Sequence, residues 1–376
     1  MDVQQPLQLL AGLSAQQFMR RHWQKKPLLV RQAIPGFQCE LGRGALFALA
    51  ARDDVESRLV TTNQAPGRGD WKLRHGPFGA RALPPLKRPG WTLLVQGIDL
   101  HVAAARRMLD QFRFIPEARL DDLMVSYASD AGGVGPHFDS YDVFLFQARG
   151  RRRWSYGRQK DLSLREDVPL KLLRSFEPEN EVVLDPGDML YLPPRYAHDG
   201  VAVGECMTWS VGFRAPAAGN LAGELLQRLA QDAADAERNS LYRDPGQAAL
   251  ASPAAIPRAL AEFARQAVHQ VLAQPLALER VLGECLTEPK ASVWFQGRSG
   301  TGAGDAVRLD ARTRMLYDEQ HVFINGESYR SRGRDARLMR ELADARSVSH
   351  AALAGASAQA RDLLNDWCAA GWLHGL

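Results

Sequence analysis

Cysteine is scarce in this chain. Only four of its 376 residues are cysteines (Cys39, Cys206, Cys285 and Cys368), and no two of them form a CxxC pair. Zinc ribbons and disulfide frameworks need closely spaced or numerous cysteines, so we expect neither. Four isolated cysteines are better explained as reduced thiols in a cytosolic compartment.

A charge excess and a long apolar run are also missing. The 47 basic and 43 acidic residues leave a net charge of +4, which is too balanced to indicate binding to nucleic acid or a membrane. No segment approaches the roughly 18 consecutive apolar residues that a membrane helix needs. Near the N-terminus the basic residues follow the short apolar run, the reverse of a signal peptide. We therefore expect a cytoplasmic protein without a membrane partner.

What the sequence does contain is a long stretch of strand patterns. Between residues 123 and 214 nearly every segment reads as a strand, and turn signals such as Pro186-Gly187-Asp188 and Pro193-Pro194 recur between them. Earlier runs at "KPLLVRQA", "RLVTTN" and "WTLLVQGIDL" have the same character. Many short strands at this spacing predict a sandwich or a barrel, as a first domain over residues 1–216.

The remainder of the chain changes to helical periodicity. Residues 220–237 and 257–274 carry leucines and other apolar residues at helical spacing, within an expected helical region at 217–288. Their apolar faces exceed what a solitary helix pair can bury, so we expect a homodimer through this region. Residues 289–376 combine a hairpin turn at Asn325-Gly326 with helices, and resemble a winged helix. Because this part lacks a clear basic recognition face, no direct nucleic-acid binding is expected.

One histidine is followed two residues later by a carboxylate. Alternate residues of an extended segment point the same way, so His137 and Asp139 converge on one point. His198 follows the strand pattern "GDMLYLPPRYA", at a point where the chain is expected to double back, and is the candidate third ligand. Two histidines and one carboxylate form the facial triad of non-heme Fe(II) oxygenases. The alternative is a chance HxD pair, with structural histidines. The other seven histidines have no such partners: His22, His75, His101, His269, His321, His350 and His374.

Three consecutive arginines follow the strand that begins after this motif. On a strand, Arg152 shares a face with the apolar Trp154 and Tyr156, whereas Arg151 and Arg153 share the other. An inward-pointing arginine is costly unless an anion meets it. In an Fe(II) oxygenase the distal carboxylate of 2-oxoglutarate is such an anion, and guanidinium binds carboxylate bidentately. The alternative is that all three arginines are exposed.

These segments resemble a known family. "DDLMVSYASDAGGVGPHFDSYDVFLFQARGRRRW" and "PGDMLYLPPRYAHDG", together with "FMRRHWQKKPLLVRQA", "SRLV", "WKLRHGPF" and "MTWSVGFRAP", are similar to the JmjC oxygenases. The resemblance is to the bacterial ribosomal oxygenases that hydroxylate an arginine of large-subunit ribosomal protein L-sixteen. It implies an α+β chain: a double-stranded β-helix (a cupin/JmjC-like jelly roll), a helical dimerisation region, and a small winged-helix-like domain that does not read DNA.

The resemblance also implies roles for individual residues. His137, Asp139 and His198 match the iron triad, and Arg152 matches the arginine that binds 2-oxoglutarate. The flanking strands place three further hydroxyl side chains near the cosubstrate: Ser126, Thr208 and Ser210. Thr208 stands where the family leads us to expect an asparagine. Two more residues are candidates to receive a substrate guanidinium, by stacking and by charge pairing respectively, or are ordinary surface residues: Tyr141 and Asp130.

The expected activity is therefore that of an Fe(II)- and 2-oxoglutarate-dependent protein hydroxylase. It would consume O2 and release succinate and CO2 while hydroxylating an arginine of ribosomal protein L-sixteen. Two alternatives remain: a JmjC demethylase of methylated lysine or arginine, and a non-catalytic cupin that binds a partner in a metal-dependent way. Formaldehyde release distinguishes demethylation from stable hydroxylation, and consumption of 2-oxoglutarate distinguishes an enzyme from a binding protein.

Overall fold

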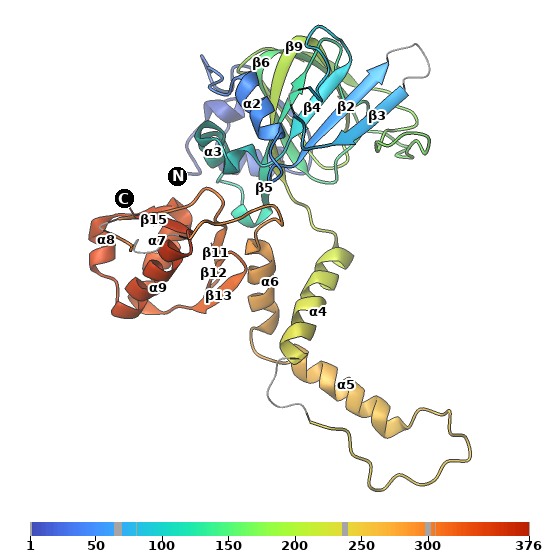
Figure 1. Cartoon of the computed structure of the whole chain (residues 1–376), viewed down its shortest axis with the longest axis vertical. Helices are drawn as coiled ribbons and strands as arrows, with labels where there is room; N and C mark the ends of the chain where they lie inside the picture. The colour runs from blue at the N-terminus through green and yellow to red at the C-terminus, as the bar shows by residue number, and fades with distance from the viewer. Residues whose placement is uncertain are drawn as a thin grey trace. The chain divides into compact units, whose positions relative to one another are not determined.

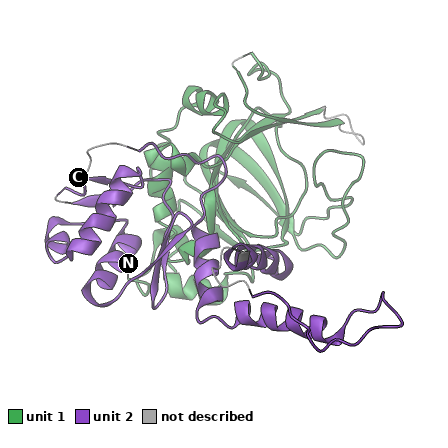
Figure 2. Ribbon diagram, turned by 60° about the horizontal axis from the view of Figure 1, so that its bottom comes forward, with its two compact units in different colours: residues 1–215 green, residues 216–376 purple. Residues whose placement is uncertain are grey.

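The computed structural model describes residues 2–63, 70–79, 81–234, 240–297, 302–304 and 306–375. The chain separates into two compact units, residues 1–215 and 216–376 (Figure 2). The expected domain boundary at residue 216 lies one residue from this division. The expected boundary at residue 288 falls inside the second unit. Within the described residues, no helix is both long and apolar enough to cross a membrane.

The first unit is built on one large sheet (Figure 1). In the described part of the chain its strands are hydrogen-bonded in the order β1-β8-β6-β9-β5-β4-β2-β3, and β7 also pairs with β6. The strands are β1 Leu28–Val30, β2 Ser57–Asn63, β3 Asp70–His75, β4 Trp91–Val95, β5 Leu120–Ala128, β6 Asp142–Gly157, β7 Asn180–Leu184, β8 Met189–Leu192 and β9 Ala197–Phe213. The pairings are antiparallel, which gives the double-stranded β-helix that the family resemblance implies.

Two long strands, β6 and β9, pair along their whole length and fold the sheet back on itself. Their register shifts on both sides of Arg149, and Gly150 has a φ of +63°. A side chain at Gly150 would lie 2.1 Å from the backbone oxygen of Glu205, so only glycine fits there. Bulges of this kind bend a strand and increase its twist. The first half of β6 pairs with β8 and the second half with β7.

Strand alternation separates the core from the inner face of the sheet. On β9, Met207, Trp209 and Val211 belong to the main hydrophobic core, and Thr208 and Ser210 between them point the other way. The same alternation holds on β4 and β5. Helices cover the core side: α1 Ala15–Arg21, α2 Arg43–Ala50 and α3 Ala103–Asp110, with short 3-10 turns η1 Gln8–Leu10, η2 Ile98–Leu100 and η3 Glu117–Arg119. A capping box between Ser14 and Gln17 fixes the start of α1.

The second unit begins with helices and ends in a winged-helix-like fold. Its helices are α4 Ala218–Ala234, α5 Arg258–Leu272, α6 Ala277–Thr287, α7 Gly333–Ala345, α8 His350–Ala354 and α9 Ala358–Ala369. Its strands form two small antiparallel sheets: β14 Ser347–Val348, β10 Val307–Leu309 and β15 Leu373–Gly375, and β11 Met315–Tyr317, β12 His321–Ile324 and β13 Glu327–Arg330. The predicted hairpin turn is confirmed, because Ile324 pairs with Glu327 and both Asn325 and Gly326 have positive φ.

The first two helices of this unit bury little within the chain. None of the residues of α5 is buried, and Leu260, Val268 and Leu272 are 39%, 60% and 39% exposed. On α4, Leu226 is 54% exposed, whereas Leu229 packs with Val281 of α6. The predicted helical segments 220–237 and 257–274 therefore correspond to α4 and α5, and residues 235–239 lie outside the described part.

Candidate metal centre and its cavity

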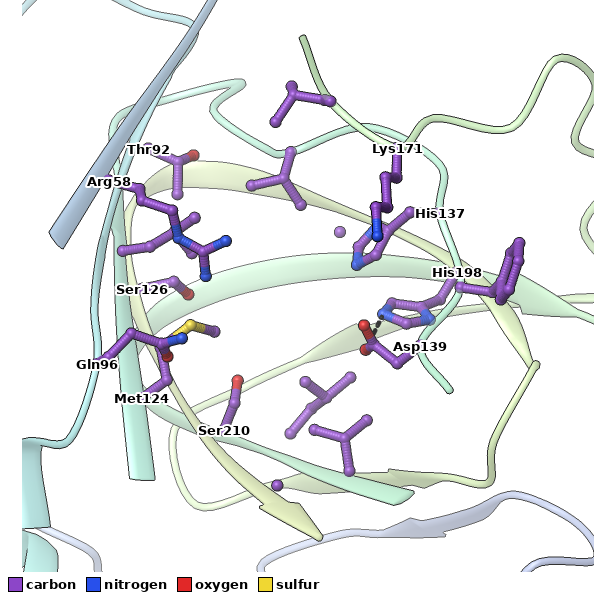
Figure 3. Close-up of a pocket in the computed structure, with 18 of the residues that line it drawn as sticks. Arg58, Thr92, Gln96, Met124, Ser126, His137, Asp139, Lys171, His198 and Ser210 are labelled. Atoms are coloured by element: carbon purple, nitrogen blue, oxygen red, sulfur yellow. Dashed lines mark ion pairs between the residues drawn. The ribbon is translucent and has the colours of Figure 1, made fainter. Parts of the chain in front are cut away.

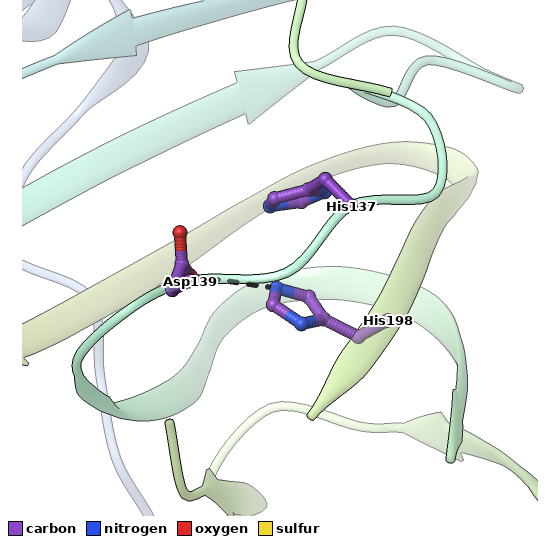
Figure 4. A group of neighbouring side chains, drawn as sticks. All are labelled: His137, Asp139 and His198. Atoms are coloured by element: carbon purple, nitrogen blue, oxygen red, sulfur yellow. Dashed lines mark ion pairs between the residues drawn. The ribbon is translucent and has the colours of Figure 1, made fainter. Parts of the chain in front are cut away.

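Three side chains meet at the point that the sequence predicts. One ligand atom from each of His137, Asp139 and His198 lies within 4.8 Å of the others (Figure 4). The ring centroids of His137 and His198 are 4.3 Å apart, and Nε2 of His198 is 3.7 Å from Oδ2 of Asp139. This is the only group of its kind found among the described residues. Two imidazoles and one carboxylate on one side of a site leave the remaining coordination positions free.

Backbone contacts fix both imidazoles. His137 and His198 form a β-bridge, with reciprocal N–H to carbonyl hydrogen bonds of 3.0 and 2.8 Å. Nδ1 of His137 donates to the carbonyl of Gly135 at 2.8 Å, and Nδ1 of His198 donates to the carbonyl of Tyr196 at 2.9 Å. Because a carbonyl only accepts, both rings carry a proton on Nδ1, which leaves Nε2 as the atom of each ring that can bind a metal. Burial and the neighbouring His137 lower the pKa of His198 to about 4, which keeps it in the neutral, ligating form.

The position of His198 differs from the expectation in one respect. It is the second residue of β9, where it pairs with Tyr156, and does not lie in a turn after β8. The tight turn is at residues 193–196, and Arg195 there has a φ of +63°. The first nine residues of β9, 197–205, mix polar and small apolar residues and contain Gly200 and Gly204, so the strand was not recognised before residue 206 from its apolar pattern.

The three arginines divide as strand alternation predicts. Arg152 is 4% exposed, and Trp154 and Tyr156 on the same face of β6 are also buried. Arg151 and Arg153 are exposed. One guanidinium nitrogen of Arg152 donates to Ser126 Oγ at 2.8 Å and to Thr208 Oγ1 at 3.3 Å. Its Nε is buried with no hydrogen-bond partner among the described residues. A buried guanidinium with unused donors is prepared for an anion.

The three hydroxyl residues expected near the cosubstrate take different positions. Ser126 and Ser210 line the cavity that also contains the triad and Arg152. Thr208 lies behind them, where it accepts from Arg152 and donates to Gln147 Oε1 at 3.0 Å. The amide of Gln147 in turn donates to the carbonyls of Arg149 and Gly150, at the bend of β6. Thr208 thus connects the arginine to the bend of the strand that carries it.

The cavity has a volume of about 460 Å³ and lies between the two halves of the folded sheet (Figure 3). Four charged residues that sequence reasoning did not single out also line it: Arg58, Asp121, Asp122 and Lys171. Asp121 and Asp122 could not be placed by strand alternation, because the pairing of β5 with β9 shifts register between Leu120 and Leu123. Arg58 could not be placed either, because only the strand order brings β2 to this wall. Lys171 comes from the loop between β6 and β7.

The two candidates for substrate binding are separated by the structure. Tyr141 lines the cavity beside Gly212 and is 37% exposed, and burial together with the neighbouring Asp139 raises the pKa of its hydroxyl. Asp130 does not line the cavity. Its side chain is exposed at the surface, where Oδ1 accepts from the backbone N–H of Gly204 at 2.8 Å. The acidic residues that do reach the cavity are Asp121, Asp122 and Asp139.

Asp122 gives one end of the cavity a buried negative charge. It is 6% exposed, and one carboxylate oxygen accepts from the backbone N–H of Gly97 at 3.1 Å. Burial and the charge of Asp122 raise the pKa of nearby Asp99 to about 6. Asp121 is paired with Arg214 at 3.0 Å. This end of the cavity therefore suits a cation, in contrast to the end at Arg152.

Two families match the chain. Residues 107–221 match the JmjC domain, and residues 270–374 match the ROXA-like winged helix. The chain is 34% identical over 277 residues to ribosomal protein uL16 3-hydroxylase of Escherichia coli (strain K12), a match that covers 73% of this chain and 71% of that relative. It is 40% identical over 208 residues to a probable ribosomal oxygenase of Haemophilus influenzae, which covers 54% of this chain and 50% of that relative.

Solved structures show the same architecture. The X-ray structure of Escherichia coli YcfD superposes with a TM-score of 0.83 at 28% sequence identity, covering 96% of this chain and 98% of that one. A structure of the same ribosomal oxygenase in complex with cobalt and 2-oxoglutarate matches with a TM-score of 0.78 over the same shares of both chains.

Proposed function

Because the chain belongs to the JmjC-type 2-oxoglutarate oxygenases, in the group of the bacterial ribosomal oxygenases, we propose that it hydroxylates an arginine side chain of ribosomal protein uL16 (L-sixteen) with Fe(II), 2-oxoglutarate and O2. The observation that carries the proposal is the single cavity that joins the His–Asp–His triad, a buried arginine and a buried carboxylate. The Escherichia coli relative is named for its action on uL16.

The donor set of the triad fits Fe(II). His137 and His198 offer Nε2 atoms and Asp139 offers a carboxylate oxygen, which is the ligand set of non-heme Fe(II) oxygenases. The carbonyls of Gly135 and Tyr196 hold the rings in the ligating tautomer. When bound, the metal with 2-oxoglutarate and O2 supplies the oxidation: one oxygen atom enters a substrate C–H bond, and 2-oxoglutarate becomes succinate and CO2.

Arg152 and its neighbours provide the site for the cosubstrate. The guanidinium, held by Ser126 and Thr208, presents its remaining donors to the distal carboxylate of 2-oxoglutarate. Ser210 lies beside Ser126 on the neighbouring strand, with Met124 opposite it, and completes this wall. Trp154, whose ring lies 5.4 Å from the Arg152 guanidinium, shields the ion pair from water.

Asp122 and Tyr141 provide the site for the substrate. Asp122 offers its carboxylate to a guanidinium, and the exposed ring of Tyr141 offers a face for stacking beside Asp139. Since Asp139 is also a proposed iron ligand, a side chain that contacts Tyr141 lies close to the metal. We assign to Asp122 the pairing with a substrate guanidinium that was expected of Asp130, because Asp122 reaches the cavity and Asp130 does not.

The test is to incubate the purified protein with Fe(II), 2-oxoglutarate and recombinant uL16 and to measure intact mass. We expect uL16 to gain one oxygen atom, located on one arginine by fragmentation, with succinate formed and no formaldehyde released. Formaldehyde would indicate the demethylase alternative. If the protein neither consumes 2-oxoglutarate nor changes the mass of uL16, that result contradicts the proposal.

We also propose that the protein is a homodimer through α4 and α5. The apolar residues Leu226, Leu260, Val268 and Leu272 are all at least 39% exposed in the single chain, and such surfaces mark interfaces. Light scattering is expected to give twice the monomer mass for the wild type, and Val268→Glu together with Leu260→Glu is expected to give a monomer. A wild-type monomer at micromolar concentration would contradict this proposal.

A further inference from the structure

A second arginine lines the same cavity as Arg152. Arg58 of strand β2 extends its side chain toward the cavity, on the wall that also carries Ser126 (Figure 3). Its side chain is 33% exposed, and its Nε is buried with no hydrogen-bond partner among the described residues. The carboxylate found near it there is that of Glu56, at 4.0 Å and 61% exposed. An ion pair as long and as exposed as Arg58–Glu56 contributes little to stability, so the Arg58 guanidinium can still bind an anion.

The sheet register places Arg58 in one row with the residues that hold Arg152. Arg58 pairs with Leu94 of β4, and Leu94 pairs with Ser126 of β5. Ser126 in turn pairs with Thr208 of β9. Directly paired residues of antiparallel strands point to the same face, and neighbouring strands lie about 4.8 Å apart. The Cα atom of Arg58 therefore lies about 10 Å from that of Ser126, with Leu94 between them, and the Arg58 side chain extends toward the Ser126 side of the row.

Arg152 reaches this row from the other half of the folded sheet. Its guanidinium contacts Ser126 and Thr208 from the second half of β6, whereas Arg58 comes from β2 at the other side of the row. Two guanidinium groups that line one cavity repel each other unless an anion lies between them. A carboxylate has two oxygens with about four acceptor positions, which is enough for both groups and for Ser126.

The level of Arg58 in the cavity decides which anion is involved. The row of Ser126 is the end where Arg152 lies, and the acidic residues Asp121 and Asp122 lie on β5 four or five residues away. A substrate guanidinium suits that acidic end. We therefore propose that Arg58 is a second binding residue for the distal carboxylate of 2-oxoglutarate, an inference that rests on the proposed function. It makes the site selective for a dicarboxylic keto acid and strengthens retention of succinate.

The experiment is an anaerobic titration of 2-oxoglutarate into the Mn(II)-loaded protein, followed by calorimetry. Arg58→Gln is expected to weaken the Kd about 5- to 30-fold, or about 1–2 kcal/mol at 1.4 kcal/mol per decade. Arg58→Lys is expected to restore part of the affinity, because it keeps the charge and loses the fork. Arg151→Gln is the matched control from the exposed face of β6 and is expected to leave the Kd unchanged. The inhibition constant of succinate is expected to rise with that of 2-oxoglutarate.

A second ligand separates binding from a structural role. In 2-oxopentanoate a methyl group replaces the distal carboxylate, so its affinity is expected to be the same in the wild type and in Arg58→Gln. An equal loss for both ligands would show that Arg58 only supports the fold, and would overturn the inference. So would an unchanged Kd for 2-oxoglutarate with a raised KM for uL16. If Arg58→Gln does not fold, Arg58→Lys carries the same comparison. A wild type that binds no 2-oxoglutarate at all would instead overturn the proposed function, and this inference with it.

Discussion

The inner face of strand β5 carries two chemically opposite ends of one cavity. Ser126 lies at the first end, where Arg152 and Arg58 supply guanidinium groups. Asp122 lies at the second end, with Asp121 next to it and Tyr141 also on the cavity wall. The two residues are four positions apart on one strand, which corresponds to about 13 Å at roughly 3.3 Å per residue. Asp122 reaches the cavity where the register of β5 shifts between Leu120 and Leu123, and Asp121 next to it lines the cavity too.

This difference in charge sorts two ligands of opposite sign. The basic end suits the dianionic 2-oxoglutarate, and the acidic end suits a cationic arginine side chain, so neither ligand competes for the site of the other. A substitution at one end should therefore change the affinity for one ligand and leave that for the other nearly unchanged. Substitutions of the metal ligands are the exception, because the ligands at both ends of the cavity depend on the same metal centre.

The largest effect is expected for Asp139→Ala, which removes the part that both ends share. Removing a residue that only hydrogen-bonds to a metal ligand already lowers metal affinity about 10–100-fold. Removing a ligand itself should therefore lower the affinity more than about 100-fold. We expect turnover to disappear while circular dichroism stays unchanged. Anaerobic Fe(II) titration measures the affinity, with Asp161→Ala, in an exposed loop, as the control. Near-normal Fe(II) binding in Asp139→Ala would remove the triad assignment.

Arg152→Ala tests the basic end. Truncation of one partner of a buried charge pair costs about 2–5 kcal/mol. The Kd for 2-oxoglutarate should therefore rise by about one and a half to four decades, at 1.4 kcal/mol per decade. The KM for uL16 at saturating 2-oxoglutarate and the affinity for Fe(II) should change little.

Two further variants serve as controls for this prediction. Arg152→Lys should recover affinity only in part, since lysine lacks the planar fork. Arg151→Ala and Arg153→Ala, on the exposed face, should behave nearly as the wild type. A larger effect at Arg151 or Arg153 than at Arg152 would reverse the assignment of the inward face.

Asp122→Asn tests the acidic end. The substitution keeps an oxygen for the N–H of Gly97 and removes the negative charge. A hydrogen bond to a charged group contributes about 1.5–3 kcal/mol, so the KM for uL16 should rise by about one to two decades. The Kd for 2-oxoglutarate should stay within about twofold of the wild type. Asp130→Asn is the matched control, because that carboxylate lies outside the cavity. If Asp130→Asn raises the KM and Asp122→Asn does not, the sequence expectation was right and the substrate lies elsewhere.

Local patterns were sufficient to predict the centre of this site. The HxD spacing and the alternation of Arg152 with Trp154 depend on neighbouring residues of one strand, and the structure brings them together as expected. The strand-rich region and the hairpin at Asn325-Gly326 are also local signals. The family resemblance added the closed form of the sheet, which no local pattern contains.

Contacts that depend on strand order could not be predicted. Arg58 reaches the cavity through the order β2-β4-β5, and register between distant strands is set by tertiary packing. Asp130 was the aspartate that the sequence analysis named as a candidate to pair with a substrate guanidinium. In the structure the side chain of Asp130 bonds to the backbone of Gly204 instead. The length of β9 was underestimated because its first half mixes polar and small apolar residues and contains two glycines.

The smallest effect is expected for Ser126→Ala, which sharpens the position of the basic end. Arg152 loses a hydrogen bond of 2.8 Å and keeps the longer contact to Thr208, so its guanidinium is held less firmly. Ser126 acts on 2-oxoglutarate through its contact with Arg152, so we expect a loss of about 0.5–1.5 kcal/mol in binding, which predicts a Kd for 2-oxoglutarate weakened about two- to twelvefold. Ser210→Ala is the matched control, because this hydroxyl also lines the cavity, whereas the hydrogen bonds found for Arg152 go to Ser126 and Thr208. It should weaken binding less than Ser126→Ala. The reverse order in the same anaerobic titration would place the distal carboxylate beside Ser210, one row closer to the acidic end, and would shorten the separation between the two ends.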